Sequence, residues 1–194
     1  MKRNMNIQKK SKPRFSLKLK ETFETCIDFY KLKPLYRILI YIGIPIMIAL
    51  IGILTDWLFP LRVEISLFNF MNDYLNISLT IVTLFVTFSM GYLSFIVGGN
   101  NESLNDLKNT ISAKYSFNGR QINLYKIIYI DISYAIFTEI IMIGILLLMK
   151  FMVLVLPNIY IKILLYLTIF LFGHIILLLF RNVKNIYYVF FSTK

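Results

Sequence analysis

Residues 163–180 read ILLYLTIFLFGHIILLLF, a stretch that contains no Asp, Glu, Lys or Arg. A stretch of this length and composition is typical of a helix that crosses the hydrocarbon layer of a membrane. Similar stretches cover about residues 38–55, 77–97 and 127–149. The sequence therefore predicts an all-α, polytopic membrane protein with four transmembrane helices.

The composition of the whole chain excludes a soluble enzyme domain. Its 194 residues are 58% hydrophobic and 16% charged, and the mean hydropathy is +0.69. A soluble globule of this size needs far more polar surface. We expect a basic arm at 1–36, a transmembrane domain at 37–181 with a polar connector at 98–126, and a tail at 182–194.

The distribution of cations predicts the orientation. Of the 21 Lys and Arg residues, eighteen precede the first span, lie in the connector or follow the fourth span. Such a bias places these segments, and both termini, in the cytoplasm. The richness in Ile, Lys, Asn, Tyr and Phe is typical of an AT-rich bacterial or phage gene, so we expect a bacterial inner membrane.

The net charge of +11 also raises the possibility of nucleic-acid binding. Because the cations flank membrane spans, anionic lipids or a cytoplasmic protein are the expected partners, and no direct contact with nucleic acid is expected. The residues assigned to this surface are Lys18, Lys20, Lys31, Lys33, Lys108, Lys114 and Arg120.

Three polar segments show local patterns. In the arm, Phe15, Leu19, Phe23, Ile27 and Tyr30 recur at helical spacing, which predicts an amphipathic helix on the inner leaflet or, alternatively, a docking helix for a cytosolic partner. Pro34 should end it before the first span. Residues 56–76 predict a short helix lying on the outer surface of the bilayer, and the connector predicts a short helix and a turn.

The second span has one face of small and hydroxyl-bearing residues. They are spaced three or four residues apart, which places them on a single face of a helix: Thr80, Thr83, Thr87, Gly91, Ser94 and Gly98. Small residues in this pattern let helices approach closely in lipid and predict a homo-oligomer. The alternative is that this stripe lines a hydrated path around an oligomer axis.

Ionisable residues within the spans predict a second polar feature. Glu139 lies near the bilayer midplane, at the depth of Thr87 and Thr168, which are its expected hydrogen-bond partners. Asp131 and His174 lie nearer the inner end of their spans and are expected to pair with each other. The set predicts a structural polar clasp, with ion conduction or a protonation switch as alternatives.

Catalytic chemistry fits the sequence poorly. One cysteine and one histidine cannot form an intrachain disulfide, a CxxC redox pair or a His/Cys metal site. The two intramembrane acids lie eight residues apart on one helix, too far apart for paired-acid catalysis. No catalytic residue, cofactor or metal site is expected.

The second span ends in Gly98-Gly99-Asn100-Asn101, and it is flanked by the basic arm and the polar connector. In this layout the chain resembles the small four-span membrane proteins of bacterial anti-phage systems, in particular the membrane subunit of Kiwa. The resemblance implies a homo-oligomer, a tetramer, that detects infection at the inner membrane and works with a cytoplasmic, nucleic-acid-binding effector.

Two functional hypotheses follow. The first is a membrane sensor and scaffold in phage defence, which recruits or regulates a cytoplasmic effector through the arm, the connector and the tail. The second is an oligomeric ion channel or membrane-permeabilising effector, in which the second-span stripe and Glu139 line the path.

Overall fold

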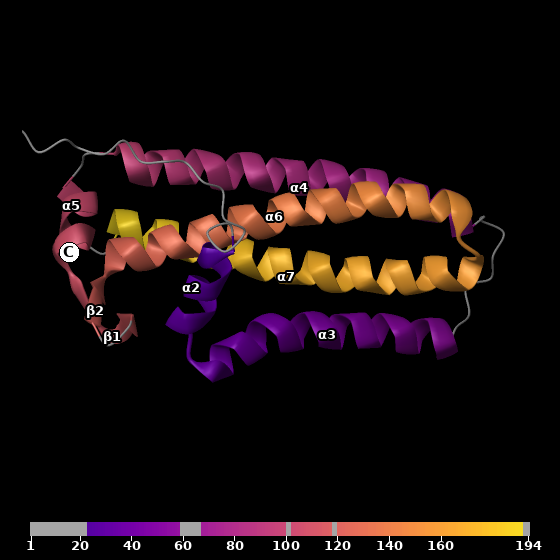
Figure 1. The fold of residues 1–194 in the computed structure, drawn as a ribbon, viewed down its shortest axis with the longest axis horizontal. Coiled ribbons are helices and arrows are strands. Elements are labelled where there is room, and N and C mark those ends of the chain that lie inside the picture. The colour runs from indigo at the N-terminus through magenta and orange to yellow at the C-terminus, as the bar shows by residue number, and fades with distance from the viewer. Residues whose placement is uncertain (1–22, 59–66, 100–101, 118–119, 192–194) are drawn as a thin grey trace, which may run out of the picture.

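The computed structural model describes residues 23–58, 67–99, 102–117 and 120–191. They include four long helices: α3 (Leu35–Leu58), α4 (Leu67–Gly98), α6 (Leu124–Val155) and α7 (Asn158–Phe191). All four are long and apolar enough to cross a membrane. The chain is therefore an all-α, multi-pass membrane protein, as the sequence predicts (Figure 1).

The helices are longer than the predicted spans. α4 begins ten residues before the expected start of the second span, and its Met71 and Leu75 are 0% and 1% exposed. These residues pack in one cluster with Met149 and Val153 of α6. The prediction of a separate short helix on the bilayer surface is therefore wrong for this segment. Likewise, α7 continues to Phe191, through residues assigned from the sequence to a separate tail.

The four helices lie side by side in the order α4, α6, α7, α3 (Figure 1). α3 packs mainly against α7 and buries only Pro45 and Ala49. The two helices approach closely at Gly173, where an added Cβ would lie 3.4 Å from the Cβ of Pro45. Most of the α3 surface is thus apolar and exposed in the protomer.

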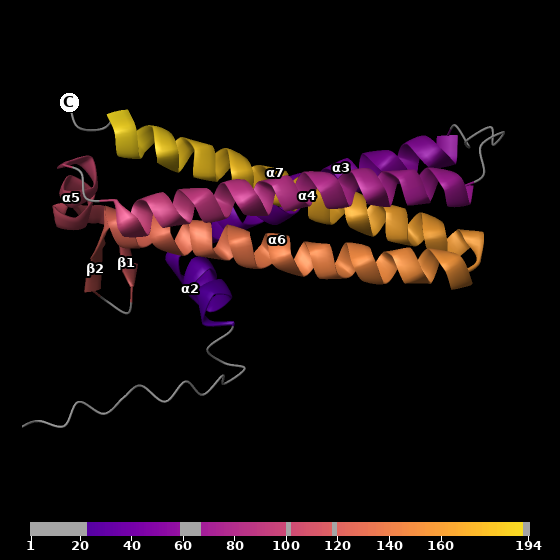
Figure 2. The same cartoon turned by 90° about the horizontal axis from the view of Figure 1, so that it is seen from above.

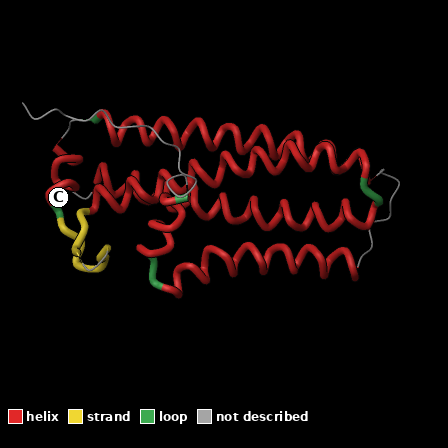
Figure 3. Tube along the Cα trace, in the orientation of Figure 1, coloured by secondary structure: helices red, strands yellow, loops and turns green. Residues whose placement is uncertain are grey.

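The short elements gather at one end of the bundle (Figure 3). α5 (Glu102–Asn109) is followed by β1 (Ile111–Phe117) and β2 (Arg120–Asn123), which pair antiparallel. The predicted connector helix is confirmed, but the hairpin was not predicted. The Asn118-Gly119 turn lies outside the described residues.

α2 (Glu24–Leu32) lies against α6 in both views (Figures 1 and 2). It ends just before Pro34, as the sequence predicts. Its buried residues are Phe29 and Leu32, whereas Phe23 and Ile27 of the predicted apolar face are 47% and 41% exposed. The first half of the predicted amphipathic helix lies outside the described residues. The described part is docked on the bundle through a different face from the one expected.

Candidate functional site

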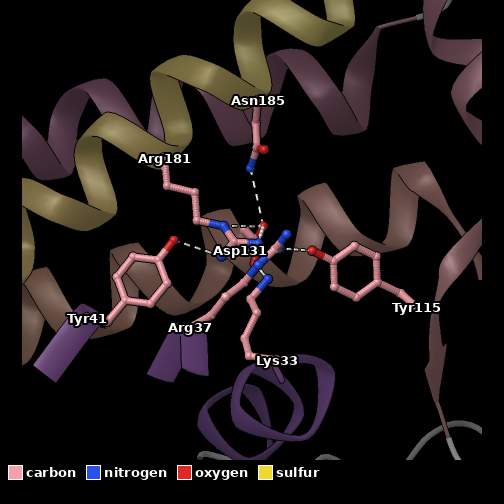
Figure 4. A network of polar contacts seen from close by, with 7 residues as sticks. All are labelled: Lys33, Arg37, Tyr41, Tyr115, Asp131, Arg181 and Asn185. Atoms are coloured by element: carbon pink, nitrogen blue, oxygen red, sulfur yellow. Dashed lines mark hydrogen bonds and ion pairs between the residues drawn. The ribbon is translucent and has the colours of Figure 1, made fainter. Parts of the chain in front are cut away.

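The candidate site is a buried cluster of ion pairs around Asp131, on the second turn of α6 (Figure 4). Lys33 Nζ lies 2.7 Å from Asp131 Oδ1. Arg181 of α7 lies 2.6 Å from Oδ2 through Nη2 and 2.7 Å through Nε. The amide of Asn185 donates to the same oxygen at 3.3 Å. One carboxylate therefore joins α6, α7 and the residue that ends α2.

Aromatic side chains surround these cations. Arg181 Nη1 donates to the hydroxyl of Tyr41 at 2.8 Å. Lys33 Nζ lies 5.0 Å from the ring centre of Phe29, and Arg37 donates to the hydroxyl of Tyr115. Cation–π contacts of this kind stabilise partly desolvated charges. Through Arg37 and Tyr115 the cluster also holds the first turn of α3 against the β-hairpin.

Lys33 corrects a prediction. The sequence places it on an exposed cytoplasmic surface, but its side chain is 0% exposed. Burial lowers the pKa of Lys33 to about 8; Asp131 opposes this effect, and the nearby Arg181 and Arg37 add to it. Lys33 therefore belongs to the cluster and is not available to a partner or to lipid.

The predicted pairing of Asp131 with His174 is also wrong. His174 lies 3.3 Å from the hydroxyl of Tyr134 through Nε2, and 2.9 Å from the carbonyl oxygen of Tyr41 through Nδ1. Tyr134 in turn contacts the hydroxyl of Tyr30 at 2.9 Å. Both residues are buried, but Asp131 faces three other partners, Lys33, Arg181 and Asn185.

Glu139 is fully buried, as expected of a midplane acid, but its partner differs. The hydroxyl of Ser89 donates to Glu139 Oε1 at 3.0 Å, while Oε2 has no hydrogen-bond partner among the described residues. Thr87 instead donates to the carbonyl oxygen of Thr83 on its own helix at 3.0 Å. Thr168 is buried and donates to α7 carbonyls. The expected bonds from Glu139 to the two threonines are absent from the described structure.

The second-span stripe faces outward from the protomer. All of its members are exposed: Thr80, Thr83, Thr87, Gly91, Ser94 and Gly98. No atom lies within 4 Å of a Cβ built on Gly91. Since Ser89 is fully buried beside Glu139, the stripe and Glu139 lie on different sides of α4. They do not share a surface in the protomer.

The remaining cations that the sequence assigns to a partner or lipid surface divide into two groups. Lys31, Lys108 and Arg120 are exposed. Lys18 and Lys20 lie outside the described residues, as does the side chain of Lys114. Within the described ranges, no group of three His, Cys, Asp or Glu residues gathers to hold a metal ion.

The cluster could have been suspected from the sequence. Asp131 lies near the beginning of the third span, and Arg181 and Asn185 lie near the end of the fourth, where an acid needs cationic partners. The sequence carries no comparable signal that Lys33 joins the cluster, because its position depends on the path of the chain between α2 and α3.

Comparison with protein-family models, with curated proteins and with solved structures finds no match to this chain. The candidate site must therefore be interpreted from its own geometry.

Proposed function

We propose that this protein is a membrane sensor and scaffold that self-associates through α4 and presents its cytoplasmic end to a soluble effector. The observation that carries the proposal is the Asp131 cluster. Asp131 joins the end of α2 to α6 and α7, and Arg181 joins α7 to α3 through Tyr41. Arg37 in turn joins α3 to the β-hairpin through Tyr115. A displacement of the spans is thereby transmitted to α2, α5 and the hairpin, which together we call the platform.

Self-association is supported by the outward stripe of α4. Three of its hydroxyls, those of Thr80, Thr83 and Thr87, donate to carbonyl oxygens four residues earlier in the same helix. Their donors are satisfied without water, so the stripe can pack against another helix in a dry interface. This geometry favours helix packing over a hydrated path. A homo-oligomer, a tetramer in the layout that the chain resembles, would bury the stripe.

The cytoplasmic assignment of the platform is supported by its cations, and it can be tested by labelling. In a Cys26→Ser background, Ser116→Cys on β1 should resist an impermeant thiol reagent added to intact cells, whereas Asn158→Cys at the opposite end should react. Ser116 is an exposed position, so shielding by the fold does not explain its protection. Labelling of Ser116→Cys from outside would contradict the proposal.

Defence against phage is the proposed context, and it rests on the resemblance in layout. The test is phage plating on cells that express the protein together with the product of its neighbouring gene, combined with co-purification of the two. Reversing Lys108 and Arg120, which are exposed on the platform, should abolish both protection and co-purification. Lys150→Glu, an exposed position at the opposite end of α6, is the matched control.

Two results would refute this function. Co-purification unaffected by the platform reversals would refute the docking surface. Protection that persists without any soluble partner, together with currents from the purified oligomer in planar bilayers, would favour the channel hypothesis instead.

A further inference from the structure

A cavity of about 740 Å³ lies beside the Asp131 cluster. Its described lining includes three cations, Arg37, Arg181 and Lys184, and contains no Asp or Glu. A basic cavity without an acid attracts anions, because the low-dielectric walls concentrate the field of the cations.

The charges around the cavity do not cancel. Among the described residues, the carboxylate beside it is that of Asp131, which is already bonded to Lys33, Arg181 and Asn185. Arg37 then adds further positive charge. The same excess contributes to the lowered pKa of Lys33, on which Arg181 and Arg37 act in the same direction as burial. An anion in the cavity would relieve this repulsion.

The cavity lies at headgroup depth. Most of its lining residues come from the first two turns of α3, the start of α6 and the final turns of the fourth span, including Tyr36, Arg37, Leu124, Ile127, Arg181 and Lys184. Leu107 of α5 and Tyr115 of β1 complete the lining. The phosphate groups of a bilayer lie where spans enter and leave the hydrocarbon layer. Lys, Arg and Tyr at this level are suited to contact them.

One wall of the cavity continues into a lipid-facing surface. Ile40 lines the cavity and is itself 47% exposed. Ile44, Met47 and Ile51 follow at intervals of four, three and four residues along α3, and they are 43%, 59% and 59% exposed. At helical spacing these residues form one apolar row that leads from the cavity along the span. The surface is thus basic at one end and apolar along its length.

We propose that the cavity binds an anionic phospholipid, with the phosphate between Arg37, Arg181 and Lys184 and an acyl chain along the α3 row. A soluble phosphate compound would use the cations but not the row. A zwitterionic lipid would use the row but carry no net charge. The inference depends on the membrane spans and is independent of the proposed function.

The test is lipid binding by the full-length protein, purified in a neutral detergent and stripped of lipid. Native mass spectrometry would measure retention of phosphatidylglycerol and, separately, of phosphatidylcholine. The variants are Arg37→Gln, Lys184→Gln and their combination. Lys108→Gln is the matched control, because Lys108 is an exposed cation at the same end that does not line the cavity.

We expect wild type and Lys108→Gln to retain phosphatidylglycerol in preference to phosphatidylcholine. The double variant should bind phosphatidylglycerol about 30-fold more weakly, which corresponds to about 2 kcal/mol at tenfold per 1.4 kcal/mol. Lys184→Gln alone should also weaken phosphatidylglycerol binding. This variant is needed because Arg37 also bonds to the hairpin, so that its replacement can disturb the fold as well as the lipid site. Arg37→Lys, which keeps the charge, should retain most of the affinity.

Three outcomes would overturn the proposal. Equal loss in Lys108→Gln would mean diffuse attraction to the basic end. Equal retention of the two lipids would mean that charge plays no part. Displacement of phosphatidylglycerol by millimolar inorganic phosphate, with no contribution from the acyl chain, would mean that the cavity takes a soluble anion.

Discussion

Replacing Asp131 with Asn removes the carboxylate that pairs with Lys33 and Arg181 while nearly preserving the shape of the side chain. The side chains of Asp131, Lys33 and Arg181 are 1%, 0% and 12% exposed. Removing one partner of a buried pair leaves the other charge uncompensated, and such changes cost about 3–5 kcal/mol. Here two cations lose their counter-ion, and the Asn oxygen still accepts one hydrogen bond. We therefore expect a loss of stability of about 3–5 kcal/mol, equivalent to a fall in melting temperature of about 6–20 °C.

Cys26 supplies the assay. It is half-buried on α2 and packs against the cluster that contains Phe29 and Tyr134. Burial raises the pKa of its thiol, so a thiol-reactive dye should label it slowly in the folded protein. Heating the protein in mild detergent with such a dye reports the release of α2 directly. The Asp131→Asn variant should react at the lower temperature.

The matched control is Asp56→Asn, at the opposite end of the bundle. Asp56 pairs with Lys162 at 2.8 Å, but these side chains are 19% and 40% exposed. A pair of this kind contributes about 0–1 kcal/mol. Adding Lys33→Met to Asp131→Asn should recover about 1–3 kcal/mol, because it removes the buried orphan cation. Equal melting shifts in Asp131→Asn and Asp56→Asn, or no recovery in the double variant, would refute the conclusion that the Asp131 cluster stabilises the packing of α2 on α6 and α7.

Three further predictions concern single positions. Gly91→Leu should weaken assembly of the oligomer in crosslinking experiments without lowering the stability of the protomer. Gly144→Leu is the control and should leave assembly intact, since a Cβ at Gly144, like one at Gly91, has no atom within 4 Å. Equal effects of the two variants would contradict an interface through the stripe. Glu139→Gln should melt at the wild-type temperature, because it keeps the acceptor for Ser89. Glu139→Leu should lower the free energy of unfolding by about 0.6–2 kcal/mol. A large effect of Glu139→Gln on stability would contradict a packing role for this residue. Burial lowers the pKa of Lys33 to about 8, from 10.5 in an unperturbed lysine. Between these pH values the unfolded chain binds more protons, so the stability that this group contributes should rise with pH. Melting curves should show this slope in wild type and not in Lys33→Met; the same slope in both would contradict it.

The sequence predicted the spans because hydropathy and length are sufficient for that purpose. It also predicted that Asp131, Glu139, Thr168 and His174 lie inside the bundle, since a polar group in hydrocarbon must find a partner. All four are buried. The predicted hydrogen-bond partners of Asp131, Glu139 and His174 were wrong. Sequence gives the depth of a residue and its angle on one helix, but the relative rotation of two helices depends on packing along their whole length.

The β-hairpin was missed although its signals are present. Ile111, Ala113, Tyr115 and Phe117 alternate with Ser and Lys, which is the period of a strand, and Asn118-Gly119 is a common hairpin turn. The segment was interpreted as a connector because it is short and lies between two spans. Its place in the fold depends on Arg37, whose bond to Tyr115 comes from a helix far away in the sequence.

The Asp131 cluster and the proposed lipid site share Arg181. Its Nε and Nη2 atoms bind Asp131, while its Nη1 atom binds Tyr41 and its side chain lines the cavity. A phosphate in the cavity would therefore act on the same guanidinium that helps to hold Asp131 and, through Lys33, the end of α2. Linkage between two such events is reciprocal, so lipid binding must change the docking of α2 by the factor by which that docking changes lipid affinity. The proposed sensor would need a coupling of this kind between the bilayer and α2, and Arg181 is the side chain in position to supply it.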